Sequence, residues 1–269
     1  MSYMIEPLPK RLRIFQQNLN KSDKAQYDLI NSSIHNNWDL ILLQEPYIDA
    51  LGNTKANHNW HVLYPMSHLA NGSVKQSVIL VNTLLDTNTW KQLPFSHSND
   101  VTVFQLEHSQ GKVTIFNIYN DCKYSDTILH LEQYVEAERH SIIQRDSDTM
   151  LWCRDFNRHH HMWDEERNHH LFTATATAEA EKLILALADY NMVMTLLKCL
   201  PTLQLMTTKN WTRVDNVFCM DNEIDSVITY DADPGTCRPG TDHIPIHTVL
   251  EVEVVLNPPT LFHNFRMAD

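Results

Sequence analysis

Met150-Leu-Trp-Cys-Arg-Asp-Phe-Asn157 and Thr241-Asp-His-Ile-Pro-Ile246 are the stretches that decide the fold of this chain. Each joins an apolar, strand-like run to acidic, amide or imidazole side chains at one end. A third stretch, Leu40-Ile-Leu-Leu-Gln-Glu-Pro46, repeats the pattern with a single glutamate. Carboxylate, amide and imidazole groups at strand ends are the parts of a metal-assisted hydrolase. The three stretches predict this chemistry together, although none would do so alone.

Strand-like runs also dominate the rest of the chain, with only a few helical patterns between them. Many strands with few helices predict a two-layered sheet core with helices outside, of class α/β or α+β. We expect a single domain over residues 1–256 and a weakly ordered tail over 257–269. Strands are expected over 12–20, 39–43, 61–64, 77–81, 101–106, 113–119, 150–153, 192–196, 213–219, 224–230 and 244–255, and helices over 23–36, 125–144 and 174–190.

Composition and charge narrow the class of protein. The formal net charge is −12, which argues against simple electrostatic capture of DNA or RNA but leaves a nucleic-acid enzyme possible. The five cysteines are odd in number and contain no C-x-x-C pair, as expected for reduced thiols. No signal-like segment or membrane-length apolar run is present. We therefore expect a soluble intracellular protein without membrane contact, in the nucleus or the cytoplasm.

Asp155 and Asn157 are the first candidate pair for chemistry. In an extended segment, residues two apart lie on the same face, so both side chains could meet a water or a phosphate. Aspartate and asparagine are also turn-forming residues, so a plain turn is the competing interpretation.

Three further positions are candidates, each with a structural alternative. His243, after Asp242, could move a proton or stabilise an oxyanion, or be a satisfied structural histidine. Glu45, which Pro46 biases toward extended backbone, could bind a hard metal or simply be solvated. Asp215 could orient a histidine or cap a strand.

A histidine-rich segment over residues 158–170 invites a zinc interpretation, which we reject. The segment has no cysteine and lacks the H-E-x-x-H pattern that places two histidines on one helix face. Adjacent histidines rarely converge on one ion.

The order and spacing of these residues resemble the endonuclease/exonuclease/phosphatase superfamily, which includes DNase I. The closer resemblance is to the endonuclease domains of LINE-type retrotransposons and their fungal stand-alone relatives. It rests on Asp155-Phe-Asn-Arg-His-His160 with Trp163, on Asn117-Ile-Tyr-Asn120 and on Asn210-Trp-Thr-Arg-Val-Asp-Asn-Val-Phe218. The similarity runs from about Leu12 to Leu250.

The resemblance implies a DNase I-like four-layer sandwich, in which two packed mixed β-sheets are flanked by helices. It also implies one divalent metal, usually Mg²⁺, with Mn²⁺ as the alternative. By position, Glu45 would bind the metal with help from Asn18 and Asp242. The reaction would be hydrolysis of a phosphodiester, with DNA as the expected substrate and a monomer as the favoured state.

The resemblance assigns the remaining roles as well. Asp155 would activate or position the attacking water, and Asn157 and Tyr119 would hold the phosphate. His243, oriented by Asp215, would stabilise the transition-state charge. These assignments agree with what the residue types can do by themselves.

One departure keeps three functions open. The family usually has glycine before the motif aspartate, whereas this chain has Arg154, which could displace the Asp155 loop, crowd the phosphate or add a phosphate contact. The leading hypothesis is a DNA-nicking endonuclease. The alternatives are a catalytically weakened, domesticated nucleic-acid-binding domain and a phosphatase or phosphodiesterase of small molecules, which the acidic charge favours.

Overall fold

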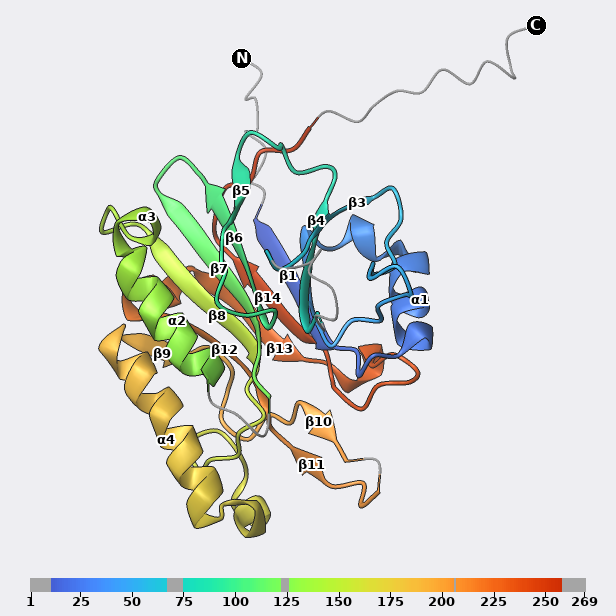
Figure 1. Cartoon of the computed structure of the whole chain (residues 1–269), viewed down its shortest axis with the longest axis vertical. Coiled ribbons are helices and arrows are strands. Elements are labelled where there is room, and N and C mark those ends of the chain that lie inside the picture. Colours follow the sequence, from blue (N-terminus) through green and yellow to red (C-terminus); the bar gives the residue numbers. More distant parts are fainter. Residues whose placement is uncertain (1–10, 67–74, 122–125, 206, 258–269) are drawn as a thin grey trace, which may run out of the picture.

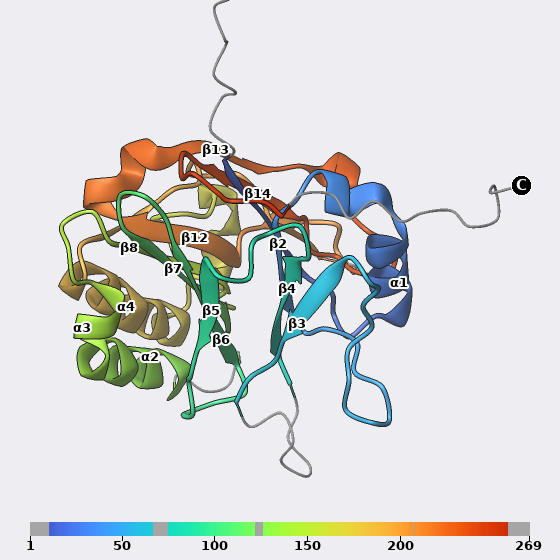
Figure 2. The same cartoon turned by 90° about the horizontal axis from the view of Figure 1, so that it is seen from above.

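Two six-stranded sheets pack face to face, with helices on their outer sides (Figure 1 and Figure 2). The computed structural model describes residues 11–66, 75–121, 126–205 and 207–257, with the backbone alone at position 154. Both sheets contain parallel and antiparallel strand pairs. The α/β sandwich of two packed mixed sheets is therefore confirmed.

The first sheet consists of β1 (Leu12–Asn18), β2 (Leu40–Gln44), β3 (Trp60–Leu63), β4 (Ser77–Asn82), β13 (Val227–Ala232) and β14 (Ile246–Leu250). Its strand order is β13-β14-β1-β2-β4-β3. At the centre, β1 and β2 are parallel and are joined through helix α1 (Asp23–Asn31) and a 3₁₀ turn (Ser33–Asn36). A parallel pair needs such a crossover, and it puts the carboxyl ends of both strands at one edge.

The second sheet repeats this plan with β5 (Trp90–Leu93), β6 (Val101–Glu107), β7 (Lys112–Tyr119), β8 (Thr149–Asp155), β9 (Met192–Met194) and β12 (Asp215–Met220). Its order is β5-β6-β7-β8-β12-β9, with β7 and β8 parallel at the centre. The crossover contains α2 (Asp126–Ala137) and α3 (Arg139–Ile142). Helix α4 (Ala174–Asp189) covers the same outer face, and β10 (Leu203–Gln204) pairs with β11 (Trp211–Thr212) in a separate ribbon.

The central strands are continuous apolar runs because alternate side chains point to opposite faces of the sheet and both faces are covered. In β8, Leu151 and Cys153 point into the core between the sheets, whereas Met150 and Trp152 point toward α2 and α4. Strands covered on both faces bury every side chain, so polar alternation disappears from their sequence. A third cluster lies between the first sheet and α1, which completes the four layers.

Both of the first two expected helices are shorter than their sequence patterns suggested. Helix α1 begins as expected, with the Ser22 hydroxyl accepting a hydrogen bond from the Ala25 N–H, but it ends at Asn31. The Ser32 hydroxyl then bonds back to the Leu29 carbonyl, and the chain leaves helical geometry. The helix expected over 125–144 is broken into α2 and α3 at Glu138, whose backbone is not helical.

The last strand is shorter as well. Pairing in β14 stops at Leu250, and the chain crosses the end of the sandwich with Val252 and Val254 packed in the core between the sheets. This segment keeps its apolar alternation without being a strand. The sequence pattern therefore could not distinguish it from the end of β14. Of the expected tail, only Asn257 lies within the described residues, where its N–H donates to the Leu84 carbonyl.

Several other strand boundaries differ from expectation, and three strands were not expected; the strand predicted over 12–20 ends at Asn18. The strand predicted over 213–219 begins at Asp215, and the one predicted over 224–230 begins at Val227 after a 3₁₀ turn (Asp221–Ser226). The strand over 192–196 ends at Met194. The sequence patterns missed β5 and the short pair β10 and β11, which are too brief for a periodic signal. The hairpin of β6 and β7 and helix α4 are confirmed.

Candidate active site

All of the candidate residues lie at one edge of the two sheets. The parallel pairs β1–β2 and β7–β8 bring their carboxyl ends to this edge, and the antiparallel strands β12 and β14 begin there. Asn18, Tyr119 and Asp155 are the last residues of their strands, and Asp215 is the first of β12. The topology therefore brings together residues that are up to more than two hundred positions apart in the chain.

Asp215 of the second sheet and His243 of the first are in direct contact. Nδ1 of His243 lies 2.9 Å from Oδ2 of Asp215, and both side chains are buried. Gln17 holds the backbone of His243, because its Nε2 donates to the His243 carbonyl at 2.9 Å. The expected orienting pair is therefore present in the structure, with Nε2 as the ring nitrogen that can meet a substrate.

The surroundings of His243 favour its charged form. Burial lowers the pKa of the imidazole, but the charge and hydrogen bond of Asp215, with the charges of Asp155 and Asp242, outweigh it and raise the pKa to about 9. At neutral pH the ring is consequently an imidazolium, which can stabilise negative charge.

Asp155 joins this pair to form a compact group. Single ligand atoms of Asp155, Asp215 and His243 all lie within 4.8 Å of one another. Oδ2 of Asp155 accepts from Asn18 Nδ2 at 2.8 Å, and Oδ1 accepts from the Asn157 N–H at 2.9 Å. Burial, and then the neighbouring charge of Asp215, raise the pKa of Asp155. A buried carboxylate with a like charge beside it is poised to take a proton or a cation.

Asn157 reaches the site through a turn and not through an extended segment, so that expectation was wrong. Strand β8 ends at Asp155, and Asn157 has a left-handed backbone with φ 49°. Its side-chain Nδ2 donates to the Asn120 carbonyl at 2.8 Å, while Nδ2 of Asn120 donates to the Phe156 carbonyl at 3.0 Å. The turn, which was the competing interpretation of the sequence, is what holds Asn157 beside Asp155.

Glu45 is also not extended, since β2 ends at Gln44 and Glu45 has φ 43°. Its Oε1 lies 3.0 Å from Nζ of Lys21. The Tyr119 hydroxyl bonds to the same carboxylate, and burial, followed by the charges of Glu45 and Asp155, raises the pKa of Tyr119. The tyrosine therefore stays protonated between the two acids.

Asp242 is half-buried and contributes charge to His243, while its carbonyl accepts from the Gln204 N–H of β10 at 2.9 Å. Among the described residues, neither Asp242 nor Glu45 belongs to the compact group of Asp155, Asp215 and His243.

The histidine-rich segment is held near the site by contacts of Asp164. Nδ1 of His159 lies 3.1 Å from Oδ2 of Asp164, and Asp164 also accepts from Asn168 at 2.7 Å and from the Arg213 N–H at 3.3 Å. This buried carboxylate thus ties the loop after β8 to the loop before β12. Sequence reasoning missed Asp164, Gln17, Asn120 and Lys21, because their contacts are with residues remote in the chain or with backbone groups.

Comparisons with known proteins agree with this architecture. The sequence matches no protein-family model and no curated protein. The structure is similar to the endonuclease domain of TRAS1, a telomere-specific non-LTR retrotransposon, with 17% identity, 89% of this chain and 98% of that chain covered, and a TM-score of 0.69.

Two other solved structures have the same arrangement. The AP endonuclease LMAP from Leishmania major has 12% identity, with 90% of this chain and 88% of that chain covered, and a TM-score of 0.69. The 3′ phosphatase NExo from Neisseria, bound to a product DNA hairpin, has 14% identity, with 89% and 99% covered, and a TM-score of 0.61.

This chain has the DNase I-like fold. The four layers expected from the resemblance are confirmed. No helix in the described part of this DNase I-like chain is long and apolar enough to cross a membrane.

The oxygen-rich edge of this DNase I-like fold fits a hard divalent cation. The groups expected to hold it are the carboxylates of Glu45 and Asp242 with the amide of Asn18, which are the kinds of group that Mg²⁺ and Mn²⁺ prefer. At the same edge Oδ1 of Asp215 is buried without a hydrogen-bond partner and the pKa of Asp155 is raised, so an added positive charge would be stabilised there.

Arg154 does not distort the backbone of this DNase I-like fold. It continues β8 in register, opposite Ile118 on one side and Asn216 on the other. Asp155 keeps its place beside Tyr119 and Asp215 in the same ladders. The expected displacement of the Asp155 loop is therefore not found.

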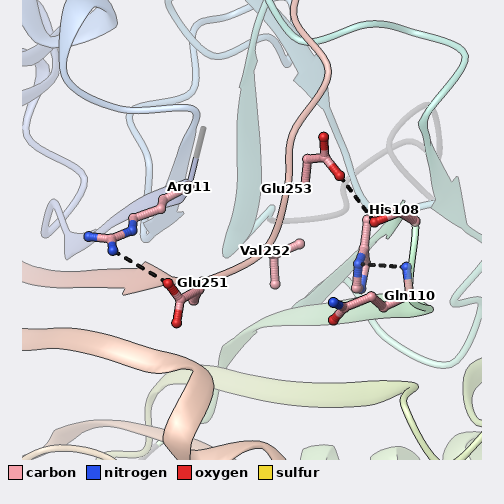
Figure 3. A pocket seen from close by; sticks show the side chains of 7 residues that line it. Arg11, His108, Gln110, Glu251, Val252 and Glu253 are labelled. Carbon is pink, nitrogen blue, oxygen red and sulfur yellow. Dashed lines mark hydrogen bonds and ion pairs between the residues drawn. The ribbon is translucent and has the colours of Figure 1, made fainter. Parts of the chain in front are cut away.

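A cavity of about 200 Å³ lies at the opposite edge of the sheets (Figure 3). It is lined by Arg11 before β1, by the turn between β6 and β7, and by the segment after β14. Arg11 pairs there with Glu251 at 3.4 Å, and Ser109 donates to Glu253 at 3.1 Å. The cavity lies where β1 begins and β14 ends, whereas the candidate active site lies where β1 ends and β14 begins. The two are therefore remote from each other.

Proposed function

We propose that the protein is a divalent-metal-dependent phosphodiester hydrolase that nicks DNA, of the retrotransposon-endonuclease type. The observation that carries the proposal is the buried group of Asp155, Asp215 and His243, which the two sheets assemble from distant parts of the chain. The neighbours in fold are named as endonucleases and a DNA 3′ phosphatase, which supports phosphodiester chemistry on DNA.

Glu45 is proposed to hold Mg²⁺ or Mn²⁺ together with Asn18 and Asp242. When bound, the metal ion supplies positive charge that polarises the phosphodiester and offsets the charge of the leaving oxygen. Glu45 provides a carboxylate on a turn, Asn18 a buried amide and Asp242 a half-buried carboxylate.

Asp155 is proposed to position and deprotonate the attacking water. Its two oxygens are already held by Asn18 and Asn157, so the carboxylate is fixed before the substrate arrives. The water oxygen forms a bond to phosphorus, its proton passes to Asp155, and the bond from phosphorus to the leaving oxygen breaks.

His243 is proposed to stabilise the charge that develops on the phosphoryl oxygens. Its pKa of about 9 keeps the ring charged at neutral pH, and Asp215 fixes its orientation. Tyr119 and Asn157, at the same edge, are proposed to hold the phosphate through a hydroxyl and an amide.

The small-molecule alternative has one specific observation in its favour, namely the net charge of −12, which opposes DNA. A phosphatase or phosphodiesterase of soluble substrates would use the same residues. The weakened binding-domain alternative loses part of its motive, because the backbone at Arg154 is regular.

Nicking of supercoiled plasmid with Mg²⁺ and with EDTA tests the proposal. Wild type is expected to nick only with the metal, and Asp155→Ala and His243→Ala are expected to lose the activity. Asp225→Ala, at an exposed acid in the 3₁₀ turn before β13, is the matched control and should nick like wild type. Nicking that persists in both site variants would refute the assignment, and turnover of soluble phosphoesters without DNA nicking would favour the small-molecule alternative.

A further inference from the structure

Lys21 is a cation at the candidate site that the proposed mechanism does not use. Its Nζ lies 3.0 Å from Oε1 of Glu45. The Glu45 side chain is 14% exposed, whereas the Lys21 side chain is 56% exposed. A largely buried carboxylate is thus neutralised by an ammonium group that approaches it from the solvent side.

The backbone is arranged to keep these two residues together. The Lys21 N–H donates to the Glu45 carbonyl at 2.8 Å, and the Leu19 N–H donates to the Gln44 carbonyl at 2.9 Å. Asn20, Lys21 and Glu45 all have left-handed backbones, with φ of 49°, 55° and 43°. Asparagine adopts this conformation readily, but for Lys21 and Glu45 it carries an energetic cost, so the two facing turns hold these residues in a strained backbone.

We propose that Lys21 is an internal cation that pairs with Glu45 and competes with the divalent ion for this carboxylate. The inference rests on the proposed function, which assigns Glu45 to the metal. An ion that binds Glu45 must displace the ammonium or lie beside it, and either event costs electrostatic energy.

Lys21 is the positively charged partner of Glu45, and it is the partner that opposes the approach of a metal ion. The other described partner of that carboxylate is the neutral hydroxyl of Tyr119, which does not repel a cation. Lys21 also has a long, half-exposed side chain that can turn into solvent. A site built in this way fills with metal at a higher free concentration than its oxygen donors alone would require.

Calorimetric titration of the full chain with Mn²⁺ tests the inference without reference to activity. Lys21→Met removes the charge at similar length and is expected to lower the Kd roughly threefold to fivefold. Lys21→Arg keeps the charge and should stay within about twofold of wild type. Lys24→Met, at an exposed lysine in the first turn of α1, is the matched control and should bind like wild type.

Glu45→Gln separates the failure of this inference from that of the proposed function. If Glu45→Gln weakens Mn²⁺ binding but Lys21→Met leaves it unchanged or weaker, Lys21 is no competitor and the inference alone is overturned. If Glu45→Gln binds like wild type, or wild type binds no Mn²⁺, the proposed metal site is wrong and the inference fails with it. Circular dichroism shows whether each variant is folded. If Lys21→Met is not folded, Lys21→Gln removes the same charge and replaces it in the titration.

Discussion

Asn18, the last residue of β1, donates its side-chain amide to Asp155, the last residue of β8, across 2.8 Å. This hydrogen bond joins the two sheets at the candidate active site. Oδ1 of Asn18 accepts from the Asn20 N–H at 2.7 Å, which fixes the orientation of the amide. Asn18 therefore contacts the proposed base directly through its side-chain Nδ2.

Asn18→Ala is expected to reduce nicking roughly tenfold to a hundredfold while the protein stays folded. The lost hydrogen bond lowers the pKa of Asp155 in the wild type, so its removal raises that pKa further. The acid limb of the pH–rate profile should consequently move to higher pH. A variant with lower activity but an unshifted profile would show that Asn18 acts on the metal alone.

Asp215→Asn should lower the pKa of His243 from about 9 toward or below its ordinary value, because burial remains while the compensating charge is gone. Activity is expected to fall by about a hundredfold or more, with the alkaline limb moved to lower pH. NMR titration of the imidazole measures the shift directly. An unchanged His243 titration would contradict the proposed role of the pair.

The stability of the metal-free protein should fall as the pH rises from about 6.5 to 9. The folded state holds the His243 proton more tightly than the unfolded chain, so this stabilisation is complete below the unfolded pKa and is lost through about pH 9. The loss is on the order of 2 kcal/mol. Urea unfolding at pH 6.5, 8 and 9.5 measures it, and His243→Gln should flatten the profile.

Arg213→Ala should destabilise the protein by about 2–4 kcal/mol. Its guanidinium is fully buried, with bonds to Asn216 and to the carbonyls of Leu196 and Leu197, so truncation leaves these acceptors unsatisfied. Arg167→Ala, at an exposed arginine paired with Glu165, should cost less than about 1 kcal/mol in the same denaturation experiment. Equal losses in the two variants would contradict this interpretation.

Arg154→Gly should cost about 0.5–1 kcal/mol, because glycine weakens a regular strand and position 154 is paired on both sides. Thermal unfolding measures that cost, and plasmid nicking by the same variant tests the binding-domain alternative. Nicking that appears only in Arg154→Gly would show that this one residue disables a preserved site. Equal nicking in both proteins would remove the reason for that alternative.

The sequence could predict the sheets because their strands are covered on both faces. Continuous runs such as Leu40–Leu43 and Met150–Cys153 are the local signature of such strands, and amphipathic spacing with the Ser22 cap marked the first helix. The sequence pattern did not place the ends of the strands correctly. Val252 and Val254 alternate like a strand while packing as an irregular segment, since periodicity reports burial and not hydrogen-bond pairing.

The sequence by itself determined the residue types and their order, which predicted a two-layered sheet core and carried the resemblance that implied the four-layer fold and the eight candidate positions. The tertiary structure decided which of them touch. Asn18 meets Asp155, and Asp215 meets His243, because parallel pairs at the centre of each sheet bring distant strand ends to one edge. It also decided that Asn157 and Glu45 sit in strained turns and that Lys21 neutralises Glu45. These contacts depend on backbone geometry and on partners remote in the chain, which no local pattern encodes.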